Sequence, residues 1–231
     1  MKKFMGIIPA LLIAAAIVVL GFCLKAGFNS LAFKDREVGV KGLAEKVVKA
    51  DEASWSMSYT LTGDELTSLY DQTTGTTKII TDFIKSSKIP ETDITIGTPS
   101  VYDARADRYG SDKINYNYSL TVTVYVSTKQ VDAVYAMCQA QGSLLSKGVP
   151  FTDTNVSYTY NGLNSIKPEM IAEATKNARE AADRFAADSQ SVLGKIKSAS
   201  QGQFEIDDIP ADKPYMKKVR VVSSIVYYLE D

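Results

Sequence analysis

The chain has 231 residues, of which 45% are hydrophobic and 23% charged, an ordinary composition for a globular protein of one large or two small domains. Its 26 basic and 27 acidic residues nearly cancel and no basic run appears, so the sequence lacks the charge pattern of a nucleic-acid binder. Histidine is absent, which removes the commonest general base and the usual ligand of catalytic zinc.

An apolar segment follows the first two lysines and extends from residue 4 to residue 24. A helix needs about 20 such residues to cross the hydrocarbon core, so residues 1–24 are predicted to form a transmembrane anchor. Cleavage as a signal peptide is the alternative, but Phe22 and Leu24 are bulky where a cleavage site needs small residues. Lipidation of Cys23 is a second alternative, which Phe22 again disfavours. The apolar side chains assigned to the anchor include Ile7, Leu11, Ile13, Val18 and Leu20.

Two lysines at the extreme N-terminus keep that end in the cytoplasm. The sequence therefore predicts a single-pass protein of the cytoplasmic (inner) membrane whose body lies in the periplasm or outside the cell. Residues 25–36 are expected to act as a tether, and residues 37–231 as one folded domain. Cys23 lies in the apolar run and Cys138 in a predicted helix, so no internal disulfide is expected.

The body opens with two extended segments. Residues 37–48 contain two apolar pairs separated by Gly42, which predicts a bent strand forming a hairpin with the next strand. Residues 53–61 alternate without exception between apolar and Ser/Thr side chains, as in a half-buried antiparallel strand. The elements expected next are a helix at 66–84, extended chain at 94–102, a polar loop at 104–112, a central strand at 113–126, a helix at 129–147 and a strand at 156–160.

From residue 53 to residue 160 this order reads strand, helix, strand, strand, helix, strand. It is the order of a ferredoxin-like sandwich, in which the helices cover one face of the sheet. The predicted fold class is therefore α+β with a mainly antiparallel sheet, extended by a long third helix and two C-terminal strands.

The third helix is predicted at residues 166–188, with a narrow apolar stripe of mostly small residues. Such a stripe lets a helix lie close to the sheet that it covers. The two strands that follow are expected at residues 194–206 and 217–229. Both faces of the last strand are largely apolar, so it should be covered on both sides, by helices and by a neighbouring subunit. The stripe on the helix consists of Ile171, Ala174, Ala178, Ala181 and Phe185.

No nucleotide-binding, hydrolase or Cys-x-x-Cys motif occurs in the sequence, so no catalytic, cofactor-binding or metal-binding residue is assigned. Three groups of carboxylates are candidate metal ligands, but each fits a solvated surface better because its spacing is wrong or no histidine accompanies it. Cys138 falls on the inward side of its helix, where cysteine is usually inert. The carboxylate groups are Asp103, Asp107 and Asp112; Glu205, Asp207 and Asp208; and Glu169 with Glu173.

Two Ser/Thr/Asn-rich strand faces, at residues 54–60 and 113–123, are candidate surfaces. They are either one solvated face of the sheet or the lining of a groove or lumen in an oligomer. The 13 tyrosines fit both alternatives, because tyrosine suits half-buried strands and interfaces alike.

Several stretches resemble the SIMPL domain, a bacterial envelope family long regarded as of unknown function. The first covers residues 38–46, together with Ala50-Asp51 and Ala53-Ser54-Trp55. The second runs from Tyr160-Asn161-Gly162 through Lys167-Pro168-Glu169 and continues to residue 202. The resemblance covers roughly residues 37–229. It implies an α+β fold, export, self-association and a connection with oxidative-stress defence, and it implies no catalytic residues.

We therefore expect a non-enzymatic, membrane-anchored SIMPL protein that forms a homo-oligomer and supports envelope integrity or oxidative-stress tolerance. No nucleic acid partner and no cofactor are expected, and no small-molecule ligand is identified. The alternative is a small-ligand binding module or an envelope enzyme that uses carboxylates and tyrosines of the loops at residues 104–112 and 203–213.

Overall fold

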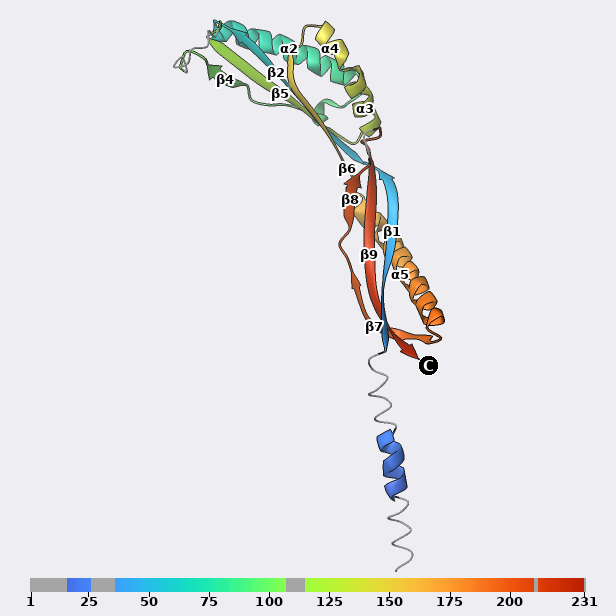
Figure 1. Ribbon diagram of the computed structural model, residues 1–231. Coiled ribbons are helices and arrows are strands. Elements are labelled where there is room, and N and C mark those ends of the chain that lie inside the picture. Colours follow the sequence, from blue (N-terminus) through green and yellow to red (C-terminus); the bar gives the residue numbers. More distant parts are fainter. Residues whose placement is uncertain (1–15, 26–35, 107–114, 210–211, 231) are drawn as a thin grey trace, which may run out of the picture. The chain divides into compact units, whose positions relative to one another are not determined.

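The computed structural model describes residues 16–25, 36–106, 115–209 and 212–230 (Figure 1). The chain divides into two compact units. We call Lys46–Ile166 with Ile206–Val219 the ferredoxin-like unit, and Met1–Glu45, Lys167–Glu205 and Arg220–Asp231 the terminal unit. The single folded domain predicted for residues 37–231 thus consists of two units, one of them built from three separate stretches of chain.

The ferredoxin-like unit contains a five-stranded antiparallel sheet in the order β3-β5-β2-β6, with β4 also paired to β5. Strands β2 and β5 lie at its centre and pair over their full lengths, with Trp55 opposite Val126 and Leu61 opposite Leu120. This arrangement confirms the predicted ferredoxin-like order. The strands are β2 (Glu52–Gly63), β3 (Ile94–Ile96), β4 (Ser100–Asp103), β5 (Tyr118–Thr128) and β6 (Phe151–Thr159).

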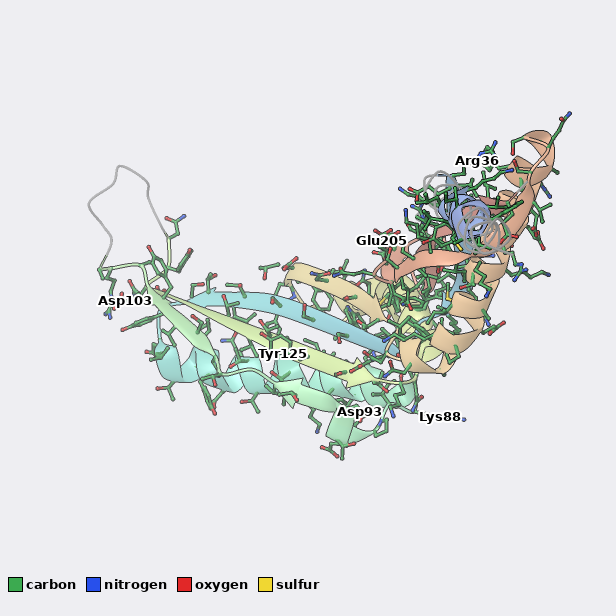
Figure 2. All side chains as sticks on the ribbon, turned by 90° about the horizontal axis from the view of Figure 1, so that it is seen from below. Arg36, Lys88, Asp93, Asp103, Tyr125 and Glu205 are labelled. Carbon is green, nitrogen blue, oxygen red and sulfur yellow. The ribbon has the colours of Figure 1, made fainter. Side chains whose placement is uncertain are left out.

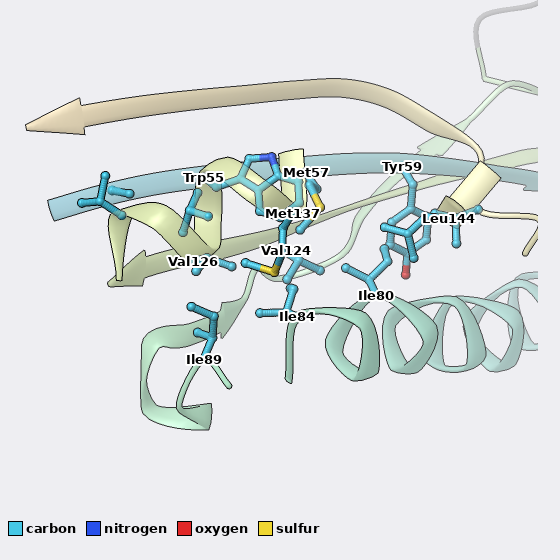
Figure 3. Close-up of a cluster of buried hydrophobic side chains, with 14 of the residues drawn as sticks. Trp55, Met57, Tyr59, Ile80, Ile84, Ile89, Val124, Val126, Met137 and Leu144 are labelled. Atoms are coloured by element: carbon cyan, nitrogen blue, oxygen red, sulfur yellow. The ribbon is translucent and has the colours of Figure 1, made fainter. Parts of the chain in front are cut away.

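Helices pack on one face of this sheet, as the alternation in β2 predicts. They are α2 (Leu66–Ser86), α3 (Val131–Ala140) and α4 (Gly142–Ser146), and a short 3₁₀ turn, η2 (Glu91–Asp93), precedes β3. Trp55, Met57 and Tyr59 of β2 point toward Ile80 and Ile84 of α2 (Figure 3). All five are fully buried, so the core of this unit is filled by large side chains.

The helix predicted at residues 129–147 is divided at Gln141 into α3 and α4. Its end is as expected: Gly148 has φ 81°, a left-handed conformation that glycine adopts without steric cost and that commonly terminates a helix.

The terminal unit contains a second sheet in the order β1-β9-β7, built from β1 (Glu37–Lys49), β7 (Val192–Gln201) and β9 (Met216–Glu230). Strand β9 lies in the middle and runs antiparallel to β7. Its pairing with β1 is also antiparallel, because Leu229 donates a backbone hydrogen bond to Arg36 while Arg220 lies beside Glu45.

Two predictions for these strands are wrong. Strand β1 does not form a hairpin with β2 but pairs with the last strand of the chain, and Gly42 does not interrupt it. The strand predicted at residues 194–206 ends at Gln201, and a separate short strand, β8 (Glu205–Asp208), pairs with β9. Alternation shows which face of a strand is buried, but it does not identify the neighbouring strand.

Helix α5 (Leu163–Asp188) packs unusually close to β1. A Cβ atom added to Gly42 would lie 1.9 Å from the carbonyl oxygen of Ala174 and 2.4 Å from the backbone nitrogen of Ala178. The backbones of strand and helix are therefore in contact, which only a glycine facing small residues permits. The core around this contact consists of Val40, Ala178, Ala182, Ile225 and Tyr227.

The stripe predicted on this helix needs correction at Phe185. Ala174 and Ala178 are fully buried as predicted and Ile171 and Ala181 are half-buried, but Phe185 is 59% exposed. The buried row follows a spacing of four, a periodicity that brings residues to one side of a helix. It contains only small residues in its second half because a phenylalanine would not fit beside the strand. Its members are Ile166, Met170, Ala174, Ala178, Ala182 and Ala186.

Residues 16–25 form a helix in which Val18 is 57% and Leu20 is 60% exposed. The other anchor residues, Ile7, Leu11 and Ile13, lie outside the described residues, as does most of the predicted tether. Among the helices that the structure describes, none is both long enough and apolar enough to span a membrane.

Candidate interaction surface

The two polar strand faces singled out in the sequence belong to one surface. Strands β2 and β5 are neighbours, and their polar residues alternate with the core residues that face the helices, so they share the opposite face of the sheet. Strand β6 continues this surface on the other side of β2. We call it the hydroxyl face; it consists of Ser54, Ser56, Ser58, Thr60, Ser119, Thr121, Thr123, Ser127, Asn155 and Ser157.

Hydroxyl groups on this face pair across the strands. Ser58 Oγ lies 2.8 Å from Thr123 Oγ1, and Thr60 Oγ1 lies 2.9 Å from Thr121 Oγ1. Such cross-strand pairs stabilise the sheet and leave further hydrogen-bonding capacity at each oxygen. Tyr125, labelled on β5 in Figure 2, adds one large side chain that is 48% exposed.

The hydroxyl face is suited to contact rather than to acid–base chemistry. Glu52, the first residue of β2, places a carboxylate at one end of this face, where it accepts a hydrogen bond from Ser127 Oγ at 3.0 Å. The ten residues that define the hydroxyl face are themselves not titratable near neutral pH. Asp153, opposite Ser58 on β6, brings a carboxylate to its margin. Regularly spaced hydroxyls can donate and accept hydrogen bonds to a docked surface, but they do not supply a group suited to acid–base catalysis.

The candidate carboxylates of the first loop are not gathered for a metal. Asp103 receives two hydrogen bonds from the Arg105 guanidinium, at 3.0 and 2.8 Å, and this guanidinium lies over the Tyr118 ring with 4.5 Å to the ring centroid. Asp107 and Asp112 lie outside the described residues. At the described end of this loop, the Asp103 carboxylate is therefore already paired with Arg105, whose guanidinium stacks on the Tyr118 ring.

The other carboxylates are distributed over both units. Asp103 and Glu205, both labelled in Figure 2, belong to different units. Glu205 Oε2 lies 4.0 Å from Arg220, and Asp208 is paired with the largely buried Lys217. Within the described parts of the chain, no group of three or more His, Cys, Asp or Glu residues could hold a metal ion. The remaining candidates, Asp207, Glu169 and Glu173, are exposed.

Cys138 is half-buried on α3 against the core of the ferredoxin-like unit. Burial raises the pKa of its thiol to about 11, because the apolar surroundings disfavour the thiolate. The nucleophilic form of this cysteine is therefore scarce at neutral pH.

Two stretches that carry the family resemblance meet at one end of the five-stranded sheet. The Asp51 carboxylate accepts hydrogen bonds from the backbone N–H of Asn161 at 2.9 Å and from its side-chain amide at 3.2 Å. The same amide donates to Glu52 at 2.8 Å. Asp51 and Asn161 thus fasten the start of β2 to the chain leaving β6, a structural role that fits the absence of other chemistry in these stretches.

Sequence reasoning missed a groove beside α2. It has a volume of about 370 Å³ and lies between one side of α2 and the edge of the sheet near β3 and β4. The signal was present in the composition of the helix: residues 66–86 include Thr67, Thr73, Thr74, Thr76, Thr77 and Thr81. Threonine is a poor helix former, so this concentration is unusual in a helix. The groove is lined by Tyr70, Thr73, Thr74, Thr77, Lys78, Thr81, Ile96, Pro99 and Val122.

Comparison with curated proteins finds no match to this sequence. Comparison with protein families gives a match over residues 38–224 to the family described as SIMPL, protein of unknown function (DUF541). The matched region includes the five-stranded sheet, most of the second sheet, α2 to α5 and the Asp51–Asn161 contact. Since it covers most of the 231 residues, the chain belongs to the SIMPL family.

Proposed function

We propose that this SIMPL protein is a non-enzymatic, membrane-anchored assembly protein of the cell envelope. In this proposal, the apolar segment at residues 1–24 holds the chain in the cytoplasmic membrane and the body lies outside the cytoplasm. Copies associate laterally and contribute to envelope integrity or oxidative-stress tolerance. No catalytic or cofactor-binding role is assigned to any residue.

The observation that carries the proposal is the hydroxyl face. Ser54, Ser127, Asn155 and Ser157 on this face are exposed, while the residues from Ala53 to Tyr59 and from Leu120 to Val126 that point to the opposite face are buried under helices. The cross-strand pairs hold its side chains in fixed positions, which lowers the entropy lost when a second surface docks on them. A chain confined to a membrane also meets its copies at high effective concentration.

The terminal unit offers a second surface for association. In β9 the residues facing α5 are buried, whereas Val222, Val226 and Tyr228, which alternate with them, are half-buried. An apolar strand face that its own unit covers incompletely is suited to contact with a partner. This supports the expectation that a neighbouring subunit covers the last strand.

The mass of the full chain, extracted in mild detergent, tests assembly. One chain has a mass of 25.2 kDa, so native mass spectrometry distinguishes a monomer from any discrete oligomer. Thr121→Arg, which places a long cation in the middle of the hydroxyl face, should dissociate the oligomer. Thr67→Arg, on the exposed surface of α2, serves as the matched control and should leave the oligomer intact. A monomer at all practical concentrations, or an oligomer unaffected by Thr121→Arg, contradicts assembly through this face.

The anchor and the physiological role need separate tests. N-terminal sequencing of the protein from the envelope fraction should recover the start of the chain; a mature protein beginning near Ala26 would contradict the uncleaved anchor. Deletion of the gene should increase sensitivity to hydrogen peroxide or to detergent, and the wild-type gene should restore resistance. A deletion strain with unchanged tolerance to both would remove the support for an envelope or stress role.

A further inference from the structure

The groove beside α2 is a built feature of the ferredoxin-like unit, distinct from the hydroxyl face. Val122, which is 2% exposed, forms part of its floor, while Tyr70 and Ile96 on its sides are 58% and 54% exposed. Its volume of about 370 Å³ is within the range of small-ligand sites, which begins at about 300 Å³.

Three threonines that line this groove donate their hydroxyl protons to backbone carbonyls of α2. Thr73 Oγ1 donates to the Tyr70 carbonyl at 2.6 Å and Thr74 Oγ1 donates to the same carbonyl at 3.1 Å. Thr81 Oγ1 donates to the Lys78 carbonyl at 3.0 Å. Because each hydroxyl has a single proton, these three side chains are left with acceptor lone pairs only.

Thr77, the fourth threonine of the groove, also donates its hydroxyl proton within the protein, in this case to the Tyr59 hydroxyl. The hydroxyl of Tyr59, which points toward α2 in Figure 3, donates to the Thr73 carbonyl at 2.8 Å. Its oxygen lies 2.6 Å from Thr77 Oγ1, and since the Tyr59 proton is already engaged, Thr77 is the donor in this contact. Thr73 itself is only 3% exposed, whereas Thr74 is exposed and Thr77 and Thr81 are half-buried. The acceptors that a ligand in the groove can reach are therefore the hydroxyl oxygens of Thr74, Thr77 and Thr81, which we call the acceptor row.

The composition of α2 gives independent support for a role of these residues. Threonine and glycine weaken a helix, yet the middle of α2 reads Thr73-Thr74-Gly75-Thr76-Thr77. Positions at which a sequence departs from local propensity are often functional. Thr74 is exposed, so packing in the core does not account for its presence.

These features select the chemistry of a ligand. A cation would be repelled by the ammonium of Lys78, and an anion, although attracted by it, would receive no hydrogen bond from the acceptor row. A purely apolar molecule would leave the acceptor lone pairs of the hydroxyls without a donor. A neutral molecule with several donors and an apolar face meets none of these costs. Its donors would bond to the threonine row and its apolar face would lie on Tyr70, Ile96 and Pro99.

We propose that the α2 groove binds a saccharide. Sugar rings carry hydroxyl donors around an edge and C–H groups on a face, which matches the acceptor row and the exposed ring of Tyr70. An extended peptide added to the sheet edge is less suitable, because β3 has only three residues and Pro99 lacks a backbone N–H. The proposal is independent of the proposed assembly function.

Ligand-observed NMR on the full chain in detergent micelles tests the proposal. Maltotriose and chitotriose are the probes, with the peptide acetyl-Val-Thr-Val-Thr-amide as the test of strand addition. At least one trisaccharide should receive saturation from the protein. Thr74→Val keeps the shape of the side chain but removes its acceptor, and should weaken binding roughly fivefold, the typical effect of one hydrogen bond. Tyr70→Ala should weaken it further, and Thr74→Ser should restore wild-type affinity.

Thr67→Val is the matched control, because Thr67 lies on the same helix and does not line the groove. It should leave saccharide binding unchanged, and circular dichroism of each variant verifies that the helix is intact. The proposal is overturned if neither trisaccharide binds, if binding survives Tyr70→Ala and Thr74→Val together, or if only the peptide binds.

Discussion

The two units of this protein achieve stable packing in opposite ways. The ferredoxin-like unit fills the space between sheet and helices with large side chains, among them Trp55, Met57 and Tyr59. The terminal unit brings α5 so close to β1 that the backbones touch at Gly42. The core of the ferredoxin-like unit depends on large side chains that fill space, and the contact between α5 and β1 depends on small residues that leave room for the backbones. The two units should therefore respond differently to the same type of substitution.

Removal of a large side chain should have its greatest effect in the ferredoxin-like unit. Trp55 is fully buried and its indole N–H donates to Thr154 Oγ1 at 2.9 Å. Trp55→Ala should lower the free energy of unfolding by about 3–5 kcal/mol, measured by urea denaturation of a chain lacking residues 1–35. Tyr125→Ala on the exposed face of the same sheet is the control and should cost less than about 1 kcal/mol. Equal effects would show that the core is not packed as described.

Addition of a single methyl group should have its greatest effect in the terminal unit. The Cβ of Gly42→Ala would collide with backbone atoms of α5 that cannot move aside independently, so we expect a loss of about 1–3 kcal/mol. Gly39→Ala on the same strand is the matched control, because its nearest atom would be Val226 Cγ2 at 3.9 Å, an ordinary contact. Hydrogen exchange should locate the loss of protection in residues 170–186 for Gly42→Ala. Unchanged protection there would contradict the backbone contact.

High pH should weaken the ferredoxin-like unit. Burial raises the pKa of Cys138 from its ordinary 9.0 to about 11 and that of Tyr158 from 10.0 to about 12. The unfolded chain then loses these protons at a lower pH than the folded chain does, so stability is unaffected below about pH 9 and falls between about pH 9 and 12. Thermal denaturation at pH 8, 10 and 11.5 should show this decrease, and Cys138→Ala should reduce its first part. An unchanged melting temperature at pH 11.5 would contradict the burial of these groups.

The smallest effect is expected for an exposed ion pair of the terminal unit. Lys197 on β7 is paired with Glu37 on β1, and both side chains are about two-fifths exposed. Lys197→Met should change stability by less than about 1 kcal/mol, and 1 M salt should remove the difference. Lys41→Met, an exposed position on β1, provides the reference in the same urea experiment. A decrease in the free energy of unfolding of more than about 2 kcal/mol would show that this ion pair stabilises the terminal unit as strongly as the Gly42 contact does.

The order of elements in the ferredoxin-like unit could be predicted from the sequence, although not every boundary, whereas the strand pairing of the terminal unit could not. Alternation in β2 and β5 distinguishes the buried face from the polar face, and the elements of that unit follow one another closely along the chain. In the terminal unit the partner of β1 lies at the other end of the body, where no local pattern points to it. On α5, hydrophobicity predicts burial of Phe185, whereas the close approach to β1 selects for small residues and leaves Phe185 exposed.

The candidate surfaces divide in the same way. The polar faces of β2 and β5 were identified from alternation, and the structure unites them in one hydroxyl face. The α2 groove does not follow from the sequence, because its lining combines α2 with Ile96, Pro99 and Val122, which are distant from that helix along the chain. Its chemistry depends on which carbonyl each hydroxyl proton meets, and residue identity alone does not give that direction.

The pairing of β1 with β9 also sets the order in which the protein can be completed during synthesis. Every strand of the five-stranded sheet has been made by Thr159, whereas β1 leaves the ribosome first in the body and has no partner until β9 follows. A long unpaired strand is a site for wrong association, and the charges of Glu37, Lys41 and Glu45 along β1 oppose it. Until the 15 residues of β9 emerge, the nascent chain thus contains a nearly complete ferredoxin-like unit and an unpaired β1.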